Sequence, residues 1–303
     1  MKYYKKFRVK PGSKVDLGKV DAGFRDKHES HEHALPEIQS LRQKLSDLQY
    51  LMYAEDRRSL LICLQGRDAA GKDGTINHVL GAMNPQGCSV TGFKVPSKEE
   101  AAHDFLWRYH KAAPGRGRIG IFNRSHYEEV LVQRVHNMVP KKIWSKRYQH
   151  INDFEKSLAE NGTHILKFYL HIDPQEQLER FRQRLDDPHR HWKISDGDYA
   201  ERPFWDAYTE AFEAALSKCS TDCAPWFIIP ANHKWFRNLA ISRIVVETLE
   251  ALDMQFPAPT VDIGEIKRKY HEIVLEEAHD DKVAAAADTG KRGGKNPGKK
   301  NRK

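Results

Sequence analysis

The chain has 303 residues, with 50 lysines and arginines against 42 aspartates and glutamates, so its formal net charge is +8. Thirteen of the positive charges and no acid lie in residues 1–14 and 289–303, which leaves residues 15–288 with a net charge of −5. A general nucleic-acid-binding body is therefore disfavoured, because its cationic face would have to come from the folded part. Any site for a polyanion must be a local cluster of cations.

The composition also bounds the class of protein. The length suits one large α/β domain with an ample core. The four cysteines include no CxxC pair and lack the spacing of a zinc site, so we expect reduced thiols. No stretch approaches the roughly 20 apolar residues that a membrane span needs. We expect a cytoplasmic protein without a membrane partner.

In chain order, the ends differ from the middle. Residues 1–33 are polar and basic, and we expect a solvated entry segment there. Residues 35–53 carry apolar side chains at alternating spacings of three and four, which predicts an N-terminal helical arm with one buried stripe. From Glu276 the chain is rich in Ala, Gly and Lys without an apolar period, so residues 276–303 are predicted to be a disordered basic tail. Residues 256–275 form a C-terminal extension before it.

Between these ends, short apolar runs alternate with helical patterns. Alternation of this kind predicts an α/β fold with a parallel sheet flanked by helices, over residues 34–255. The predicted strands are 59–65, 88–93, 118–122, 163–171 and 225–229. The predicted helices are 72–83, 98–112, 125–138, 144–161, 174–186, 198–218 and 234–252.

The first of these strands runs directly into a phosphate-binding motif. Residues 66–74 read GRDAAGKDG, which matches G-x-x-x-x-G-K, and a helix follows at once. Glycines let backbone N–H groups surround phosphate oxygens, the helix N-terminus adds its positive end, and the lysine reaches the phosphates. We expect Lys72 to be catalytic and the rest of the loop to bind phosphates or nucleotide, through Gly66, Arg67, Ala69, Ala70, Gly71, Asp73 and Gly74.

Two acids depart from the usual form of this motif. The Ser/Thr that normally binds Mg²⁺ is replaced by Asp73, and Asp68 lies inside the loop. A carboxylate in a phosphate cradle repels the ligand unless a cation bridges them, so we infer Mg²⁺ held partly by Asp68. Asp73 fits equally well as a first-turn acid that favours the helix dipole.

A second group of polar residues follows the strand at 118–122. Ligands of open α/β sheets gather at the carboxyl ends of strands, so Asn123, Arg124 and Glu128 are expected to point into the same cleft. Arg124 suits the charge on a transferring phosphoryl group. Glu128 could bind a metal or the acceptor, or complete a capping box with Ser125. His126 is expected to be structural.

Further cations predict a mobile lid and a polyanion track. The loop 186–197, rich in Arg and Asp between two helices, is typical of a lid that closes on phosphates. We assign to the lid and track Lys94, Arg118, Arg134, Arg184, Arg190 and Lys193. The stripe formed by Trp205, Tyr208, Phe212 and Leu216 is more typical of a core than of a nucleobase platform.

Four blocks of the sequence resemble the polyphosphate kinase 2 family: the loop at 66–74, FKVPSKEEAAHDFLWRYH at 93–110, GRGRIGIFNRSHYEEVLVQRVH at 115–136 and HWKISDGDYAERPFWDAY at 191–208. The resemblance covers roughly residues 35–255. It implies a thymidylate-kinase-like P-loop fold and Mg²⁺-dependent phosphoryl transfer between inorganic polyphosphate and AMP, ADP or ATP. It also implies a homo-oligomer.

The resemblance implies roles for individual residues as well. Lys72 and the loop amides would bind phosphates, and Asp68 would support metal and catalysis. Many members have an Asp-Arg pair where this chain has Asn123-Arg124, which shifts the metal role to Asp68 and Glu128. The FNRSHYE form resembles the subgroup that phosphorylates both AMP and ADP.

Two other functions stay open on the sequence. One is an ATP-dependent nucleoside monophosphate kinase, and the other is a non-catalytic P-loop protein that binds polyphosphate with its basic tail.

Overall fold

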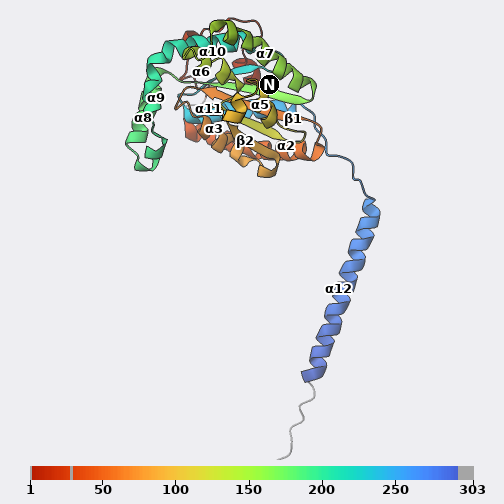
Figure 1. Ribbon diagram of the computed structural model, residues 1–303. Coiled ribbons are helices and arrows are strands. Elements are labelled where there is room, and N and C mark those ends of the chain that lie inside the picture. The colour runs from red at the N-terminus through yellow and green to blue at the C-terminus, as the bar shows by residue number, and fades with distance from the viewer. Residues whose placement is uncertain (1, 28–29, 293–303) are drawn as a thin grey trace, which may run out of the picture. The chain divides into compact units, whose positions relative to one another are not determined.

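The computed structural model describes residues 2–27 and 30–292, which fall into two units, Met1–Phe256 and Pro257–Lys303 (Figure 1). The first unit is built on one five-stranded sheet in the order β2-β3-β1-β4-β5, in which every pairing is parallel. Its strands are β1 (Ser59–Gly66), β2 (Cys88–Gly92), β3 (Ile119–Asn123), β4 (Thr163–His171) and β5 (Trp226–Pro230). The predicted α/β fold and its five strands are confirmed.

Helices cover both faces of this sheet because alternate residues of β1 point to opposite sides. Leu60, Ile62 and Leu64 pack into one core with α2 (His31–Glu55), α3 (Lys72–Val79) and α11 (Lys234–Glu250). Leu61 and Cys63 pack into the other core with α5 (Trp107–Ala112), α7 (Lys141–Glu160) and α10 (Trp205–Cys219). A strand buried on both faces is what a parallel sheet requires, and all eight residues of β1 are buried.

Four predicted helices are each broken into shorter pieces. The stretch 72–83 forms α3 and the 3₁₀ turn η2 (Leu80–Ala82). The stretch 98–112 forms α4 (Lys98–Ala101) and α5, and 125–138 forms the 3₁₀ turn η4 (His126–Glu129) and α6 (Val132–Val135). The stretch 198–218 forms α9 (Asp196–Ala200), η6 (Arg202–Phe204) and α10, because Pro203 cannot continue a helix. The remaining elements of residues 8–256 are η1 (Leu17–Lys19), η3 (Pro85–Gly87), α8 (Pro174–Leu185) and η5 (Pro188–Lys193).

The N-terminal segment is integrated into the core, so the prediction of a solvated entry segment is wrong. Residues Lys2–Phe7 form α1, whose Tyr3 and Phe7 are buried against Phe236. Glu247 accepts hydrogen bonds from the N–H groups of Lys2, Tyr3 and Tyr4, which satisfies the start of the helix. The prediction relied on the many basic residues and gave no weight to the aromatic side chains between them.

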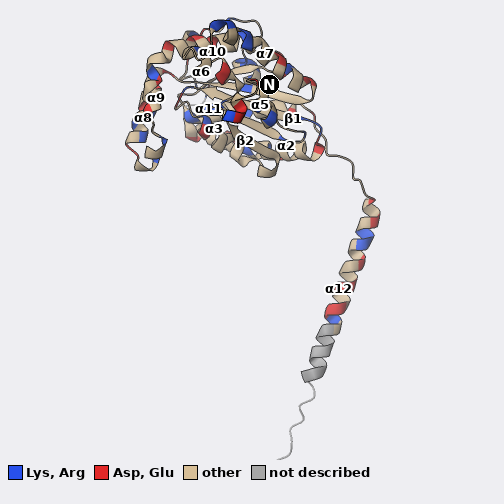
Figure 2. Cartoon of the chain, viewed as in Figure 1, with Lys and Arg blue, Asp and Glu red and all other residues tan. Residues whose placement is uncertain are grey.

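The second unit contains the long helix α12 (Ile263–Arg292), in which acids and bases are interspersed (Figure 2). The prediction of disorder from Glu276 is therefore wrong as far as Arg292, because an alanine-rich run favours helix. The remaining predicted tail, 293–303, lies outside the described residues. Among the helices of residues 2–27 and 30–292, none combines the length and apolarity needed to cross a bilayer.

Candidate active site

The phosphate-binding loop lies at the carboxyl end of β1, as the motif predicts. It leaves the strand at Gly66 and enters α3 at Lys72, with Gly71 as the N-cap at a φ of 101°. This positive φ favours glycine, and a Cβ would also overlap the present position of the Arg237 guanidinium. Lys72 Nζ donates to the carbonyl oxygens of Gly66, at 2.7 Å, and Arg67, at 3.3 Å. The ammonium group is thus held inside the curve of the loop.

Burial shifts the ionisation of Lys72, as it does that of Arg237. It lowers the pKa of the ammonium group to about 8, helped by the nearby charge of Arg124. Asp68, Glu128 and Asp73 oppose this shift but do not cancel it. The positive charge of Lys72 is therefore poorly compensated by the protein, which prepares it to bind phosphate.

The ends of β1 and β3 bring together the residues predicted to be catalytic. Arg124 lies between two carboxylates, 3.0 Å from Asp68 Oδ1 and 3.6 Å from Glu128 Oε2. Its backbone is left-handed, with a φ of 65°, and its N–H donates to Leu64 O at 3.1 Å. A non-glycine residue held in this conformation at a strand end indicates a functional constraint.

Asp73 and Asn123 form a second pair beside the loop. Asn123 Nδ2 donates to Asp73 Oδ1 at 2.7 Å, so the asparagine orients the first-turn acid of α3. In the described part of the chain, no three His, Cys, Asp or Glu side chains gather as a metal site. Mg²⁺ in phosphoryl-transfer sites, however, needs only one or two carboxylates and takes its other ligands from phosphates and water. Asp68 and Glu128 fit that donor set.

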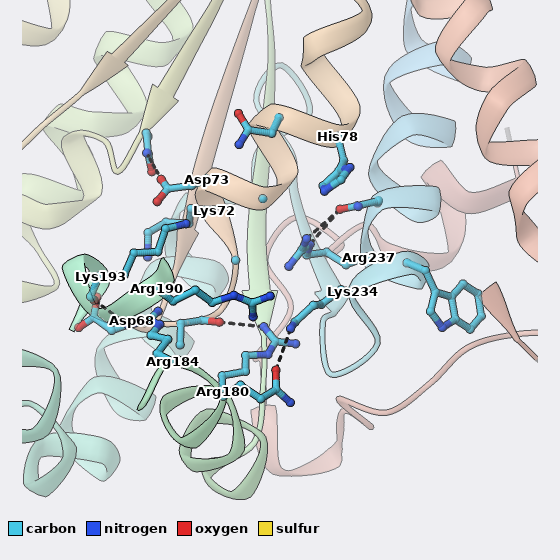
Figure 3. Close-up of a pocket in the computed structure, with 18 of the residues that line it drawn as sticks. Asp68, Lys72, Asp73, His78, Arg180, Arg184, Arg190, Lys193, Lys234 and Arg237 are labelled. Atoms are coloured by element: carbon cyan, nitrogen blue, oxygen red, sulfur yellow. Dashed lines mark hydrogen bonds between the residues drawn. The ribbon is translucent and has the colours of Figure 1, made fainter. Parts of the chain in front are cut away.

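A cavity of about 960 Å³ opens on one side of the loop, and its wall is strongly cationic (Figure 3). Acids that line it are Asp68, Asp73 and Asp198. Cations that line it come from seven elements or loops and are Arg42, Lys72, Lys94, Arg124, Arg180, Arg184, Arg190, Lys193, Lys234 and Arg237. Clustered cations of this density fit a ligand with many negative charges.

Four of the predicted track and lid residues line this cavity: Lys94, Arg184, Arg190 and Lys193. The lid segment places η5 beside it, where Arg184 Nη1 contacts Asp198 Oδ2 at 3.1 Å and Trp192 is 78% exposed. The loop 186–197 therefore lies beside this cavity, and its role as a lid stays a prediction.

The assignments of Arg118 and Arg134 to the track are wrong. Arg118 immediately precedes β3, at the edge of the sheet opposite the ligand edge, and lies over the Tyr53 ring. Arg134 belongs to α6, lies over Trp144 and donates to Tyr148 Oη at 3.3 Å. Both residues flank the motif in sequence, but neither side chain lines the cavity.

Two buried arginines that line the cavity also donate hydrogen bonds to carbonyl oxygens of the phosphate loop. Arg180 is 4% exposed and donates to the carbonyl oxygens of Ala69, at 2.8 Å, and Ala70, at 3.0 Å. Arg237, on α11, donates to Ala70 O at 3.2 Å, and burial together with Arg180 lowers its pKa to about 9.

Sequence reasoning missed Arg237 and Lys234. The signal was the start of a helix just after β5, because that position lies at the ligand edge of a parallel sheet.

A second, small pocket of about 40 Å³ lies on the other side of the loop. Asp68 and Arg124 line both cavities, and Glu128, Trp205 and Tyr208 line the small one. Arg67 also points to this side, with its guanidinium 3.7 Å from the Trp205 ring centroid. The aromatic stripe is therefore divided: Leu216 is wholly buried, as predicted for a core, whereas Trp205, Tyr208 and the largely buried Phe212 line this pocket.

Comparison with known proteins agrees with this geometry. The family model described as polyphosphate kinase 2 matches residues 27–257. The chain is 49% identical over 256 residues to an AMP/ADP-polyphosphate phosphotransferase of Meiothermus ruber, covering 84% of this chain and 96% of that protein. It is 47% identical over 268 residues to an ADP-polyphosphate phosphotransferase of Rhodopseudomonas palustris, covering 84% and 93%.

Solved structures give the same answer. The crystal structure of polyphosphate kinase 2 from Arthrobacter aurescens TC1 matches with a TM-score of 0.86 and 40% sequence identity, covering 89% of this chain and 96% of that one. The chain belongs to the polyphosphate kinase 2 family.

Proposed function

We propose that this protein transfers a phosphoryl group between inorganic polyphosphate and adenine nucleotides, and that it accepts both AMP and ADP. One observation carries the proposal. Asp68 and Arg124 stand between a large cation-lined cavity and a small pocket with aromatic walls. A phosphoryl group that passes between ligands on the two sides would be held by these residues. The names of the relatives from Meiothermus ruber and Rhodopseudomonas palustris support the acceptors.

The large cavity is the side that suits polyphosphate. This polymer carries about one negative charge per phosphate and has no base to stack, so its affinity must come from cations and depend on salt. The lid residues Arg184, Arg190 and Lys193 supply part of that charge.

The small pocket is the side that suits the nucleotide. Trp205 and Tyr208 offer ring surface beside Glu128 and Arg124. A volume of about 40 Å³ is too small for a nucleotide, since ligand pockets measure roughly 300–1,000 Å³. We therefore expect η6 and the start of α10, which line this pocket with Arg202 and Trp205, to move away from the phosphate loop when AMP or ADP binds.

The transfer itself asks for positioning and charge stabilisation rather than covalent chemistry. An acceptor phosphate oxygen attacks the terminal phosphorus of polyphosphate in line, and the shortened polymer leaves. Lys72 and Arg124 hold the charge that spreads over the moving group. No strong general base is required, because the attacking oxygen is already anionic.

Mg²⁺ is part of the proposal, with Asp68 and Glu128 as its protein ligands. When bound, it would neutralise phosphate charge next to these carboxylates, which are now balanced by Arg124.

A comparison of donors tests the function. The purified protein is incubated with AMP or ADP, together with either long-chain polyphosphate or ATP, and the nucleotides are separated by chromatography. We expect polyphosphate to convert AMP to ADP and ADP to ATP. Product from AMP with ATP but not with polyphosphate would instead indicate a nucleoside monophosphate kinase, and no product from any pair would indicate a binding protein.

A further inference from the structure

A fully buried polar network lies directly beneath the Arg124 segment and takes no part in the proposed chemistry. Its members are Glu155 on α7, Lys167 on β4, and His126 and Tyr127 on η4, each with no exposed surface. Ionic groups without solvent are costly, and they persist when hydrogen bonds satisfy them completely. The question is therefore what this arrangement holds in place.

Glu155 is the centre of the network. Its Oε1 lies 2.9 Å from His126 Nε2 and accepts a hydrogen bond from Tyr127 Oη at 2.9 Å, while its Oε2 lies 2.6 Å from Lys167 Nζ. Lys167 uses its other two protons on Tyr127 Oη, at 2.8 Å, and on Cys219 O, at 2.6 Å. One carboxylate thus ties a helix and a central strand to two consecutive residues of η4.

The charges of the network are fixed by its environment. Burial raises the pKa of Glu155, but Lys167 and His126 together hold it below its ordinary value, so the carboxylate is ionised. Burial lowers the pKa of His126 and raises that of Tyr127, so both stay neutral. A single buried ion pair, Glu155 and Lys167, therefore anchors two neutral side chains.

These anchored residues follow Arg124 at once. Arg124 has the left-handed φ of 65°, and the hydroxyl of the next residue, Ser125, accepts a hydrogen bond from Gln65 Nε2 at 3.1 Å. Three successive buried side chains after Arg124 are thereby fixed, in a region where an arginine backbone is otherwise disfavoured. Strained backbone of this kind persists only when its surroundings over-determine it.

We propose that Glu155 is a positioning residue that aims Arg124 at the phosphoryl group by holding η4 through His126 and Tyr127. This inference rests on the proposed function. The link is mechanical: releasing η4 lets the Arg124 backbone relax, which moves the guanidinium away from Asp68. A misplacement of about 1 Å can cost roughly 100-fold in rate.

Kinetics of two variants test the proposal in the full chain. Glu155→Gln/Lys167→Met removes both buried charges together, so that neither is left unpaired. Tyr127→Phe keeps the ion pair and removes only the hydroxyl link. We expect kcat at saturating polyphosphate and ADP to fall roughly 10- to 100-fold in the double variant and about threefold or more in Tyr127→Phe, with KM values within about twofold. Wild-type kcat in folded variants would overturn the proposal.

Non-additivity separates positioning from a merely structural role. In an Arg124→Ala background, the same substitutions should lower kcat by less than about twofold further, because the residue they position is already absent. If the substitutions lower kcat by the same factor in the Arg124→Ala background as in the wild-type protein, the proposal is contradicted. The matched control is Thr163→Val, which removes the buried hydrogen bond of 2.9 Å between the hydroxyls of Ser59 and Thr163. These residues begin β1 and β4, at the edge of the sheet away from the site. The control substitution should lower the melting temperature and leave kcat unchanged.

A crystal structure of Tyr127→Phe gives a readout that does not depend on activity. We expect Arg124 to lose its contact with Asp68 or its left-handed φ. An unchanged Arg124 would refute the positioning role. Absence of transfer in the wild-type protein would instead refute the proposed function and leave this structural readout to decide the inference.

Discussion

Lys72 combines a functional charge with a cost to folding. Its ammonium group is buried in the loop, and desolvation is the main reason why its pKa falls from 10.5 to about 8. Between these two pH values the unfolded chain binds more protons than the folded one, so this residue's unfavourable contribution is complete below pH 8 and is relieved as the pH rises toward 10.5. On the proposed function, bound phosphate would compensate this charge.

Replacing this lysine should therefore separate activity from stability. We expect Lys72→Met to lower turnover at least ~100-fold. At pH 7 its free energy of unfolding should be higher by about 1–3 kcal/mol, because the buried charge is gone. The gain should shrink when denaturant unfolding is repeated at pH 9.5. Near-normal turnover would show that the loop lysine does not hold the transferred group.

Gly71 shows a different constraint at the same scale. Its positive φ strains any other residue, and the guanidinium of Arg237 packs where a Cβ would lie. The sequence motif predicts a glycine here, but it does not reveal which residue occupies the space that the missing Cβ leaves.

At the scale of elements, the segment predicted to be a lid places several cations beside the phosphate loop. The segment from α8 to α9 contributes Arg184, Arg190 and Lys193 to the cavity. Helix α8 is anchored by Arg180, which donates to the phosphate loop and pairs with Glu176 at 2.6 Å. Its base is therefore fixed to the site, while the loop beyond Leu185 presents cations to the cavity.

The lid cations should govern affinity for the polymer more than turnover. We expect Arg190→Ala/Lys193→Ala to raise the KM for polyphosphate about tenfold and to reduce its dependence on salt, because two cationic contacts are lost. The matched control is Arg182→Ala on α8, which removes a mostly exposed arginine that pairs with Glu179. Equal KM values for the two variants, measured at two ionic strengths, would rule out a lid role.

At the scale of the whole molecule, the unit Met1–Phe256 holds all the parts of the fold on which the site depends. It contains the entire sheet, both hydrophobic cores and every residue of the two cavities. Helix α12 belongs to the other unit, and its exposed apolar residues include Ile266 and Tyr270.

A chain that ends at Phe256 should therefore keep its function. We expect its kcat, its KM for polyphosphate and its melting temperature to match those of the full chain, because site and cores are intact. Activity assays and calorimetry check this. Loss of polyphosphate binding in the shortened chain would place the anion site in the basic tail and support the non-catalytic alternative.

Local sequence determined the elements and the chemistry that follows them. Short apolar runs between helical patterns located all five strands, since a buried parallel strand needs an unbroken apolar run. The glycines and lysine of residues 66–74 determined the phosphate loop, and the ends of β1 and β3 placed Asp68 and Arg124 together. These features depend on residues near one another along the chain.

Only the tertiary structure decided which distant side chains complete the site. Arg118 and Arg134 flank the motif but lie away from the cavity, whereas Arg237 lies 166 residues beyond Gly71 and touches the same loop. The buried pair of Glu155 and Lys167 was likewise invisible, because its partners come from separate elements. Burial and direction of a charged side chain follow from packing, and packing is set by residues far apart in sequence.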